Sequence, residues 1–234
     1  MRYLFALILF LSPVLHAETE KPVVTHAVLV HGIWERGTLS FAMLRGELES
    51  RGVKVLTPDL RPATAHNGLT PLARQLKQEI EDTFGPDQEF LMLGFSMGGL
   101  VGRLYLQDMG GAERCQTFIT VSSPHHGTEM AHLHPGKGAA EMRPGSVFLS
   151  DLEKNAVKLR DIPVISYHTP HDLVIVPFES SIWSLAENVE IHCPLHGLMC
   201  QTPSLLEDVL GRFGYPHPPM LKKETRRLGA PHRR

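Results

Sequence analysis

The chain has 234 residues, a formal net charge of −2, and a composition of 42% hydrophobic and 21% charged residues. This length and balance suit one globular domain of moderate size with a sizeable core. The small net charge gives no reason to expect nucleic acid as a partner.

The first 17 residues have the pattern of a signal peptide. Arg2 supplies a positive charge, an apolar run extends from Tyr3 to Leu11, and Ala17 is a small residue at a plausible cleavage point. The run is shorter than the roughly 20 residues that cross a bilayer, so a retained membrane anchor is the less favoured alternative. We therefore expect a mature protein that is periplasmic or secreted.

Apolar runs and helical patterns alternate through the next part of the chain. Most of the runs are continuous, as in parallel strands that are covered on both faces. Such alternation predicts a single α/β domain over residues 18–213, with a doubly wound sheet. The predicted strands are Val24–Val30, Val53–Thr57, Glu89–Phe95, Thr117–Val121, Pro163–Ser166 and Val189–His192. Predicted helices contain Phe41, Leu44 and Leu48; run from an N-cap at Thr70 to Gly85; and contain Leu205, Leu206, Val209 and Leu210.

Residues 94–98 read Gly-Phe-Ser-Met-Gly, directly after a predicted strand and before a helical pattern. Glycines two positions on either side of Ser96 allow the tight turn that projects its hydroxyl at the carboxyl end of the sheet. The N-terminus of the following helix places its positive dipole where negative charge would develop. The pattern predicts a nucleophilic serine, with a bystander serine in a glycine-rich turn as the alternative.

The motif Gly-Phe-Ser-Met-Gly-Gly resembles that of α/β-hydrolase lipases and esterases. Val28–Trp34 resembles the first strand and oxyanion loop of the small bacterial lipases, and Ser123–Thr128 is similar to a later loop of the same enzymes. The resemblance implies an α/β-hydrolase fold and an esterase or lipase that needs no cofactor.

Two backbone amides are candidates for the oxyanion hole, which stabilises the charged tetrahedral intermediate. One is the amide of Met97, the residue after the nucleophile. The other, implied by the resemblance, is the amide of Ile33. His31 is expected to bond the backbone of that loop and not to transfer protons.

In this fold an acid and then a histidine follow the serine along the chain. Asp172 lies on a turn after a predicted strand and would hold the imidazole in the productive tautomer. Glu179 is the reserve candidate for the acid. His196 follows the last predicted strand, and its His-Gly-Leu sequence resembles the corresponding lipase loop. The predicted triad is Ser96, Asp172 and His196, with His192 and His171 as weaker choices for the base.

The predicted function is an exported serine hydrolase that cleaves carboxylic esters of small molecules or lipids. A transacylase, thioesterase or amidase with the same triad is the alternative, and a non-catalytic binding protein is less favoured because every part of the machinery is present. Trp34 and Phe95 are the substrate-binding candidates, with Met97, Leu133 and Leu173 as further apolar neighbours.

Two segments lack periodicity. The irregular stretch from Thr128 to Gly145 is too short for a lid domain, so we expect little interfacial activation and a preference for short and medium acyl chains. Residues 214–234 have the composition of a disordered basic tail, with weak contact to a membrane surface as an alternative. We expect a monomer.

Histidines and cysteines offer two further hypotheses. Four histidines could suggest a metal site, but few acidic ligands cluster with them, so we expect no metal. They are His125, His126, His132 and His134. Cys193 and Cys200 flank His196, and in an oxidising compartment they are predicted to pair and leave Cys115 over. Three buried, reduced cysteines are the alternative.

Overall fold

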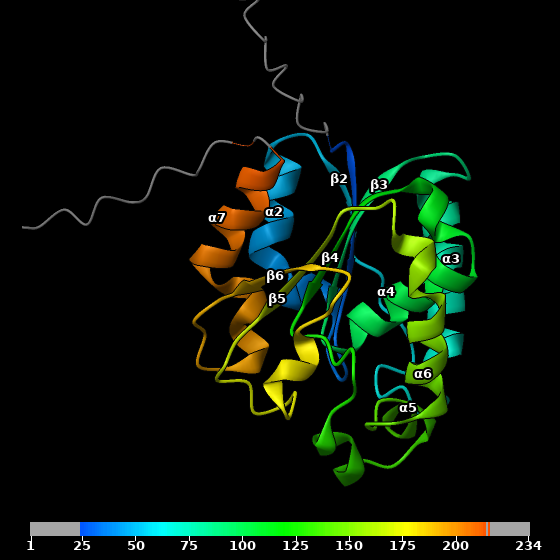
Figure 1. Cartoon of the computed structure of the whole chain (residues 1–234). Coiled ribbons are helices and arrows are strands. Elements are labelled where there is room, and N and C mark those ends of the chain that lie inside the picture. The colour runs from blue at the N-terminus through cyan, green and yellow to red at the C-terminus, as the bar shows by residue number, and fades with distance from the viewer. Residues whose placement is uncertain (1–23, 214, 216–234) are drawn as a thin grey trace, which may run out of the picture.

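Six parallel strands form one sheet in the order β2-β1-β3-β4-β5-β6 (Figure 1). The computed structural model describes residues 24–213 and residue 215, so the predicted signal peptide and nearly all of the predicted tail lie outside the described residues. All six predicted strands are present, and the α/β-hydrolase fold with a single domain is confirmed. The strands are β1 (His26–Val30), β2 (Lys54–Leu56), β3 (Phe90–Phe95), β4 (Cys115–Val121), β5 (Val164–His168) and β6 (Glu187–Glu190).

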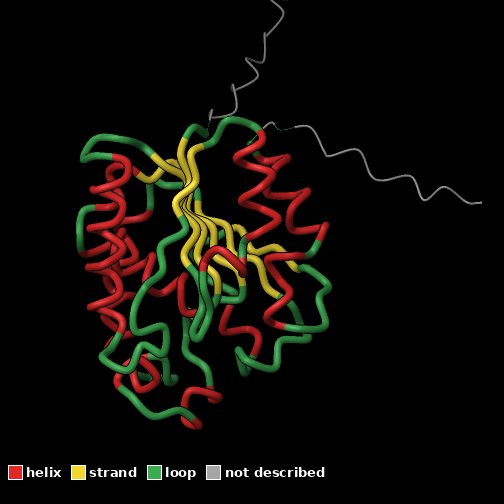
Figure 2. The backbone as a smooth tube through the Cα atoms, turned by 180° about the vertical axis from the view of Figure 1, so that it is seen from behind, coloured by secondary structure: helices red, strands yellow, loops and turns green. Residues whose placement is uncertain are grey.

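Helices cover both faces of the sheet, as Figures 1 and 2 show from opposite sides. On one face, α2 (Ala42–Ser50) and α7 (Pro203–Arg212) pack on the strands, and α1 (Gly37–Ser40) precedes α2. On the other face lie α3 (Leu69–Phe84), α4 (Met97–Asp108) and α6 (Val147–Lys154). Short 3-10 turns complete the described part: η1 (Gly111–Arg114), η2 (Glu129–Leu133), η3 (Asn155–Leu159), η4 (Phe178–Ser181) and η5 (His196–Gln201).

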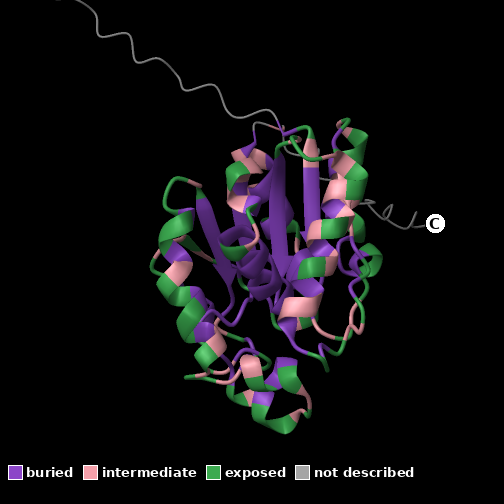
Figure 3. Ribbon diagram, turned by 90° about the vertical axis from the view of Figure 1, so that its right-hand side faces the viewer, coloured by how far each residue is buried: buried purple, intermediate pink, exposed green. Residues whose placement is uncertain are grey.

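The strands alternate their side chains between two apolar layers. In β1, Val28 and Val30 join the layer under α3 and α4, whereas Ala27 and Leu29 join the layer under α2 and α7. The central strands are therefore buried on both sides (Figure 3). This double burial is why the strand sequences are continuously apolar.

Helix α3 begins one residue before the predicted N-cap, Thr70. The N-cap residue is Gly68, at φ +97°, and the amide of Leu69, which has no partner within the helix, donates to Glu141 Oε2 at 2.7 Å. A carboxylate from a distant segment thus caps the helix where the sequence suggested a local hydroxyl. The other end is as predicted, because Gly85 follows the last helical residue at φ +80°.

The stretch from Thr128 to Gly145 contains η2 and α5 (Lys137–Glu141), so the prediction of an irregular segment is wrong. It lies beyond the lower end of the sheet in Figure 1, and backbone hydrogen bonds attach it to residues 65 and 66. In the described part of the chain, no helix is long and apolar enough to cross a membrane.

Candidate active site

Ser96 occupies a tight turn between β3 and α4, with φ +54° and ψ −124°. Its backbone amide donates to the carbonyl of Val121 at 2.8 Å, which extends the pairing of β3 with β4. A Cβ on Gly98 would lie 2.1 Å from the carbonyl oxygen of Val30, and one on Gly94 would lie 2.6 Å from the carbonyl oxygen of Gly98. The two glycines are therefore steric requirements of the turn, as the sequence predicts. A serine in this sparsely populated conformation is a mark of a functional site.

The loop after β1 packs directly against this turn. A Cβ on Gly32 would lie 3.2 Å from the Cβ of Ser96. His31 is fully buried and holds the loop: its Nε2 accepts from the amide of Leu60 at 3.1 Å, so Nδ1 carries the proton and donates to the carbonyl of Gly32 at 2.7 Å. His31 is therefore a structural histidine, as expected.

The amides of Ile33 and Met97 donate to no acceptor among the described residues. Both residues line the same pocket as Ser96. Met97 is the first residue of α4, where helix geometry leaves the amide without an intrahelical partner. Two free donors beside a serine hydroxyl are an arrangement that can receive a developing oxyanion.

Asp172 and His196 form a hydrogen-bonded pair. Nδ1 of His196 lies 2.8 Å from Oδ2 and 3.0 Å from Oδ1 of Asp172. The same carboxylate accepts from the amides of Val174 and Ile175, both at 2.9 Å. Burial by itself would raise the pKa of Asp172, but the hydrogen bond and charge of His196, together with the two amides, lower it below its ordinary value. Asp172 is thus held as an anion.

The ring of His196 lies beside the nucleophile turn, because it packs on Phe95 with 4.9 Å between ring centroids. The weaker candidates are placed elsewhere. His171 and His192 are exposed and face each other at 6.3 Å, and Glu179 is exposed on η4. Among the described residues, none of these three side chains makes a hydrogen bond to Asp172 or His196.

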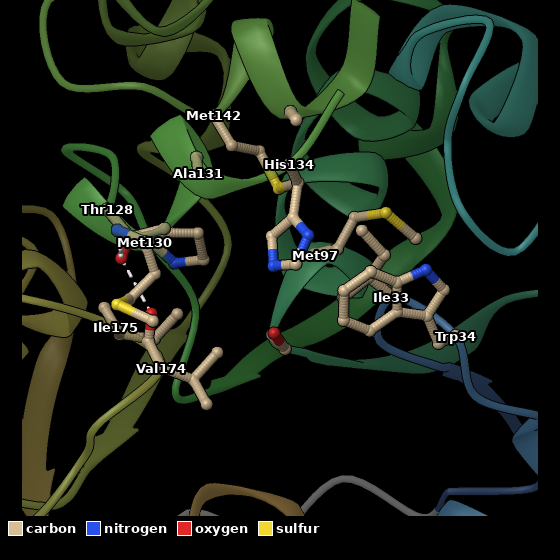
Figure 4. Close-up of a pocket in the computed structure, with 13 residues that line it drawn as sticks. Ile33, Trp34, Met97, Thr128, Met130, Ala131, His134, Met142, Val174 and Ile175 are labelled. Carbon is tan, nitrogen blue, oxygen red and sulfur yellow. Dashed lines mark hydrogen bonds between the residues drawn. The ribbon is translucent and has the colours of Figure 1, made fainter. Parts of the chain in front are cut away.

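Ser96 opens into an apolar pocket of about 140 Å³ (Figure 4). Two of the apolar residues considered for substrate binding, Trp34 and Met97, line it. Phe95 does not line it and is only 1% exposed, so its ring supports His196 instead. Leu133 and Leu173 are exposed and also lie outside the lining. The lining residues are Ile33, Trp34, Ser96, Met97, Pro124, Thr128, Met130, Ala131, His134, Ala139, Met142, Val174 and Ile175.

A buried polar network behind the pocket was not predicted. Arg103 of α4 is fully buried, stacks on Trp183 at 4.0 Å, and donates to Glu153 at 3.0 Å and to His125 Nδ1 at 3.3 Å. Because a guanidinium only donates, Nδ1 of His125 is an acceptor and Nε2 donates to Thr120 Oγ1 at 3.1 Å. The network holds the loop that contributes Pro124 to the pocket. Its one sequence signal is a lone arginine in an apolar helix.

The four histidines considered as metal ligands have separate partners. His125 belongs to the buried network, and Nε2 of His126 lies 3.2 Å from the carbonyl of Ile182. Nε2 of His132 lies 3.6 Å from Oε2 of Glu129, and the ring of His134 packs edge-to-face on that of Trp34. Within residues 24–213 no three His, Cys, Asp or Glu side chains are grouped to hold a metal ion.

The predicted Cys193–Cys200 disulfide is absent, since all three cysteines are buried, unpaired thiols. The thiol of Cys193 donates to the carbonyl of Leu195 at 3.2 Å, and burial raises the pKa of Cys200 well above its ordinary value. The loop of His196 is held instead by Thr169, whose hydroxyl donates to the carbonyl of Cys193 at 2.9 Å.

Comparison of the sequence with known families identifies the one to which this chain belongs. The sequence model for palmitoyl protein thioesterase matches residues 26–160, more than half of the chain. No curated protein matches the sequence significantly.

Solved structures share the fold at low sequence identity. Lipase BlEst2 of Bacillus licheniformis has a TM-score of 0.63 and 17% identity, over 86% of this chain and 94% of that one. Lipase B of Aspergillus fumigatus has a TM-score of 0.70 and 16% identity, over 83% of this chain and 54% of that one. A pyrethroid hydrolase of Sphingobium faniae has a TM-score of 0.56 and 16% identity, over 83% and 99%. The chain is an α/β hydrolase of lipase, esterase or thioesterase type and belongs to the palmitoyl protein thioesterase family.

Proposed function

We propose that the protein hydrolyses carboxylic esters through an acyl-enzyme on Ser96, with His196 as base and Asp172 as the acid that orients it. The observation that carries this proposal is the hydrogen bond between Asp172 and His196, next to a serine in a strained turn. A carboxylate on Nδ1 leaves Nε2 as the proton acceptor for the serine hydroxyl.

The proposed reaction has two halves. In the first, Nε2 of His196 takes the proton of Ser96 as Oγ attacks the acyl carbon, and the amides of Ile33 and Met97 donate to the oxyanion. The intermediate then collapses, the ester C–O bond breaks, and His196 gives its proton to the leaving alcohol. In the second half, water repeats the attack with His196 as base, and the carboxylic acid leaves.

A thioesterase is the second candidate, because the matching family model is that of a palmitoyl protein thioesterase. The residues would act in the same way, with a C–S bond broken and a thiol released in place of an alcohol. Paired oxygen and thio esters of one acyl group separate the two candidates by kcat/KM. Product analysis with an added alcohol separates hydrolysis from acyl transfer.

The test of the proposed function is Ser96→Ala, with Ser50→Ala as matched control. Ser50 is an exposed serine at the end of α2 and does not belong to the pocket lining. Ser96→Ala should fold normally and lose about four or more orders of magnitude in kcat, while the control stays at the wild-type rate. A short-chain organophosphonate should label Ser96 alone. An active Ser96→Ala variant, or labelling at another residue, would disprove the mechanism.

Export is a separate proposal, supported by the composition of residues 1–17 alone. Expression with the full N-terminus should give a mature protein that starts after Ala17 in the periplasm or medium, as peptide mass mapping of each fraction would reveal.

A further inference from the structure

The pocket at Ser96 offers almost only hydrocarbon to a ligand. Of its thirteen lining residues, four carry a polar side-chain atom: Ser96, Thr128, His134 and Trp34, whose only one is the indole N–H. The hydroxyl of Thr128 is occupied, because it donates to the carbonyl of Val174 at 2.7 Å. His134 packs its ring against Trp34, with 4.5 Å between centroids and an interplanar angle of 79°. This lining favours an apolar substrate part, because a charged or hydroxylated group would lose its hydration there and find few new partners.

One wall of the pocket comes from η2, α5 and Met142, and Figure 4 shows Met142 across the pocket from Val174. This wall is attached to the loop before α3 by several hydrogen bonds. The amide of Lys137 donates to the carbonyl of His66 at 2.9 Å, and that of Gly138 donates to the carbonyl of Ala65 at 3.0 Å. Glu141 of the same wall adds a further bond, because its carboxylate accepts from the amide of Leu69 at the start of α3.

The approach of the wall to this loop is close as well as hydrogen-bonded. A Cβ on Gly138 would lie 2.5 Å from both the Cβ and the carbonyl oxygen of Ala65. At its other end, the amide of Thr128 donates to the carbonyl of Met142 at 2.9 Å. A wall held at both ends in this way does not move aside for a longer ligand at low cost, so the pocket has a fixed depth.

The volume then sets the size of the group that fits. The pocket measures about 140 Å³. An apolar protein cavity of about 150 Å³ accommodates a benzene molecule, which has six carbons. An extended sixteen-carbon chain is far larger than this space. A long acyl group would have to leave most of its methylenes outside the pocket.

We propose that this pocket is the acyl subsite and that it selects short apolar acyl groups of about four to six carbons, with Met142 and Ala139 as the residues that limit chain length. The inference rests on the proposed hydrolysis at Ser96. The proposed substrates carry shorter acyl groups than the palmitoyl group after which the matching family is named.

The first measurement is kcat/KM for p-nitrophenyl esters from acetate to hexadecanoate, each kept below its solubility limit. While methylenes enter the pocket, each should raise kcat/KM by about fourfold, the value of one buried methylene. The rise should end at about six carbons, when the pocket is full. Dodecanoate should be no better than hexanoate.

Two variants change the depth of the pocket in opposite directions. Met142→Ala removes the end of a side chain that is 6% exposed, and should move the preferred chain length upward by about two carbons. Ala139→Val adds two carbons to the same wall and should lower kcat/KM for hexanoate about tenfold relative to acetate. Met43→Ala is the matched control, because Met43 is half exposed on α2, on the opposite face of the sheet. Its chain-length profile should equal that of the wild type.

The outcomes separate the inference from the function beneath it. A kcat/KM that keeps rising to dodecanoate, or an unchanged optimum in Met142→Ala, overturns the acyl subsite while Ser96 remains the nucleophile. If Met142→Ala does not fold, as judged by circular dichroism, Ala139→Val decides in its place. If no ester is turned over and a butyl phosphonate fails to label Ser96, the proposed function fails, and the acyl subsite with it.

Discussion

The hydroxyl of Thr128 donates a hydrogen bond to the carbonyl of Val174 at 2.7 Å and accepts one from the amide of Val176 at 3.0 Å. These bonds fix the backbone just after Asp172, whose carboxylate accepts from the amides of Val174 and Ile175. Thr128 is therefore a positioning residue for the acid, although it belongs to the loop after the preceding strand. It also connects the acid to the pocket wall, since its own amide donates to Met142.

We expect Thr128→Val to lower kcat between about tenfold and a hundredfold, because a shift of the acid by about 1 Å misplaces the base. Valine keeps the shape of threonine and removes only the hydroxyl. Thr128→Ser keeps the hydroxyl and should recover most of the rate. A Thr128→Val enzyme that loses thermal stability but keeps the wild-type kcat would show that the hydrogen bonds serve the fold alone.

Asp172→Asn tests the role of the acid directly. Asparagine keeps the size of the carboxylate but donates where the carboxylate accepts, which favours the wrong tautomer of His196. We expect kcat to fall by about four orders of magnitude, as in comparable triads. Glu179→Gln is the control on the reserve acid, which is exposed on η4, and should leave kcat unchanged. The reverse result, with activity lost only in Glu179→Gln, would exchange the two assignments.

The central parts of the site were predictable because their geometry and chemistry require particular residue types at particular positions in the sequence. The glycines around Ser96 have no room for a Cβ, and the order of serine, acid and histidine follows the order of the strands. The network of Arg103 was not predictable, because its partners come from three other segments. Phe95 was misassigned for a similar reason: an apolar residue beside a motif does not reveal which side of the sheet it faces.

His125 should make stability depend on pH. Burial and then the charge of Arg103 hold its pKa well below the ordinary value, so the folded protein keeps this ring neutral. The unfolded chain binds a proton there below about pH 6.5. The free energy of unfolding should therefore decrease as the pH is lowered below that value, by up to about 1.4 kcal/mol per pH unit. His26 and His168 act in the same direction.

The variant His125→Gln isolates this contribution. Glutamine accepts from Arg103 and donates to Thr120, as the neutral ring does, and it does not titrate. Urea unfolding between pH 5 and pH 8 should give a smaller slope for the variant than for the wild type. Equal slopes in the two proteins would mean that His125 is protonated in the folded state.

The turn at Ser96 makes the last prediction. Because a Cβ on Gly98 would lie 2.1 Å from the carbonyl oxygen of Val30, Gly98→Ala must separate α4 from β1. We expect it to lose about 3 kcal/mol or more of unfolding free energy and to lose activity, since the amide of Met97 and the hydroxyl of Ser96 move with the helix. Gly46→Ala is the matched control, because Gly46 is exposed within α2 and a Cβ there meets nothing within 4 Å. That control should gain up to about 1 kcal/mol by its higher helix propensity. Urea unfolding and the rate of butyrate ester hydrolysis measure both effects, and a stable, active Gly98→Ala protein would contradict the close approach of α4 to β1.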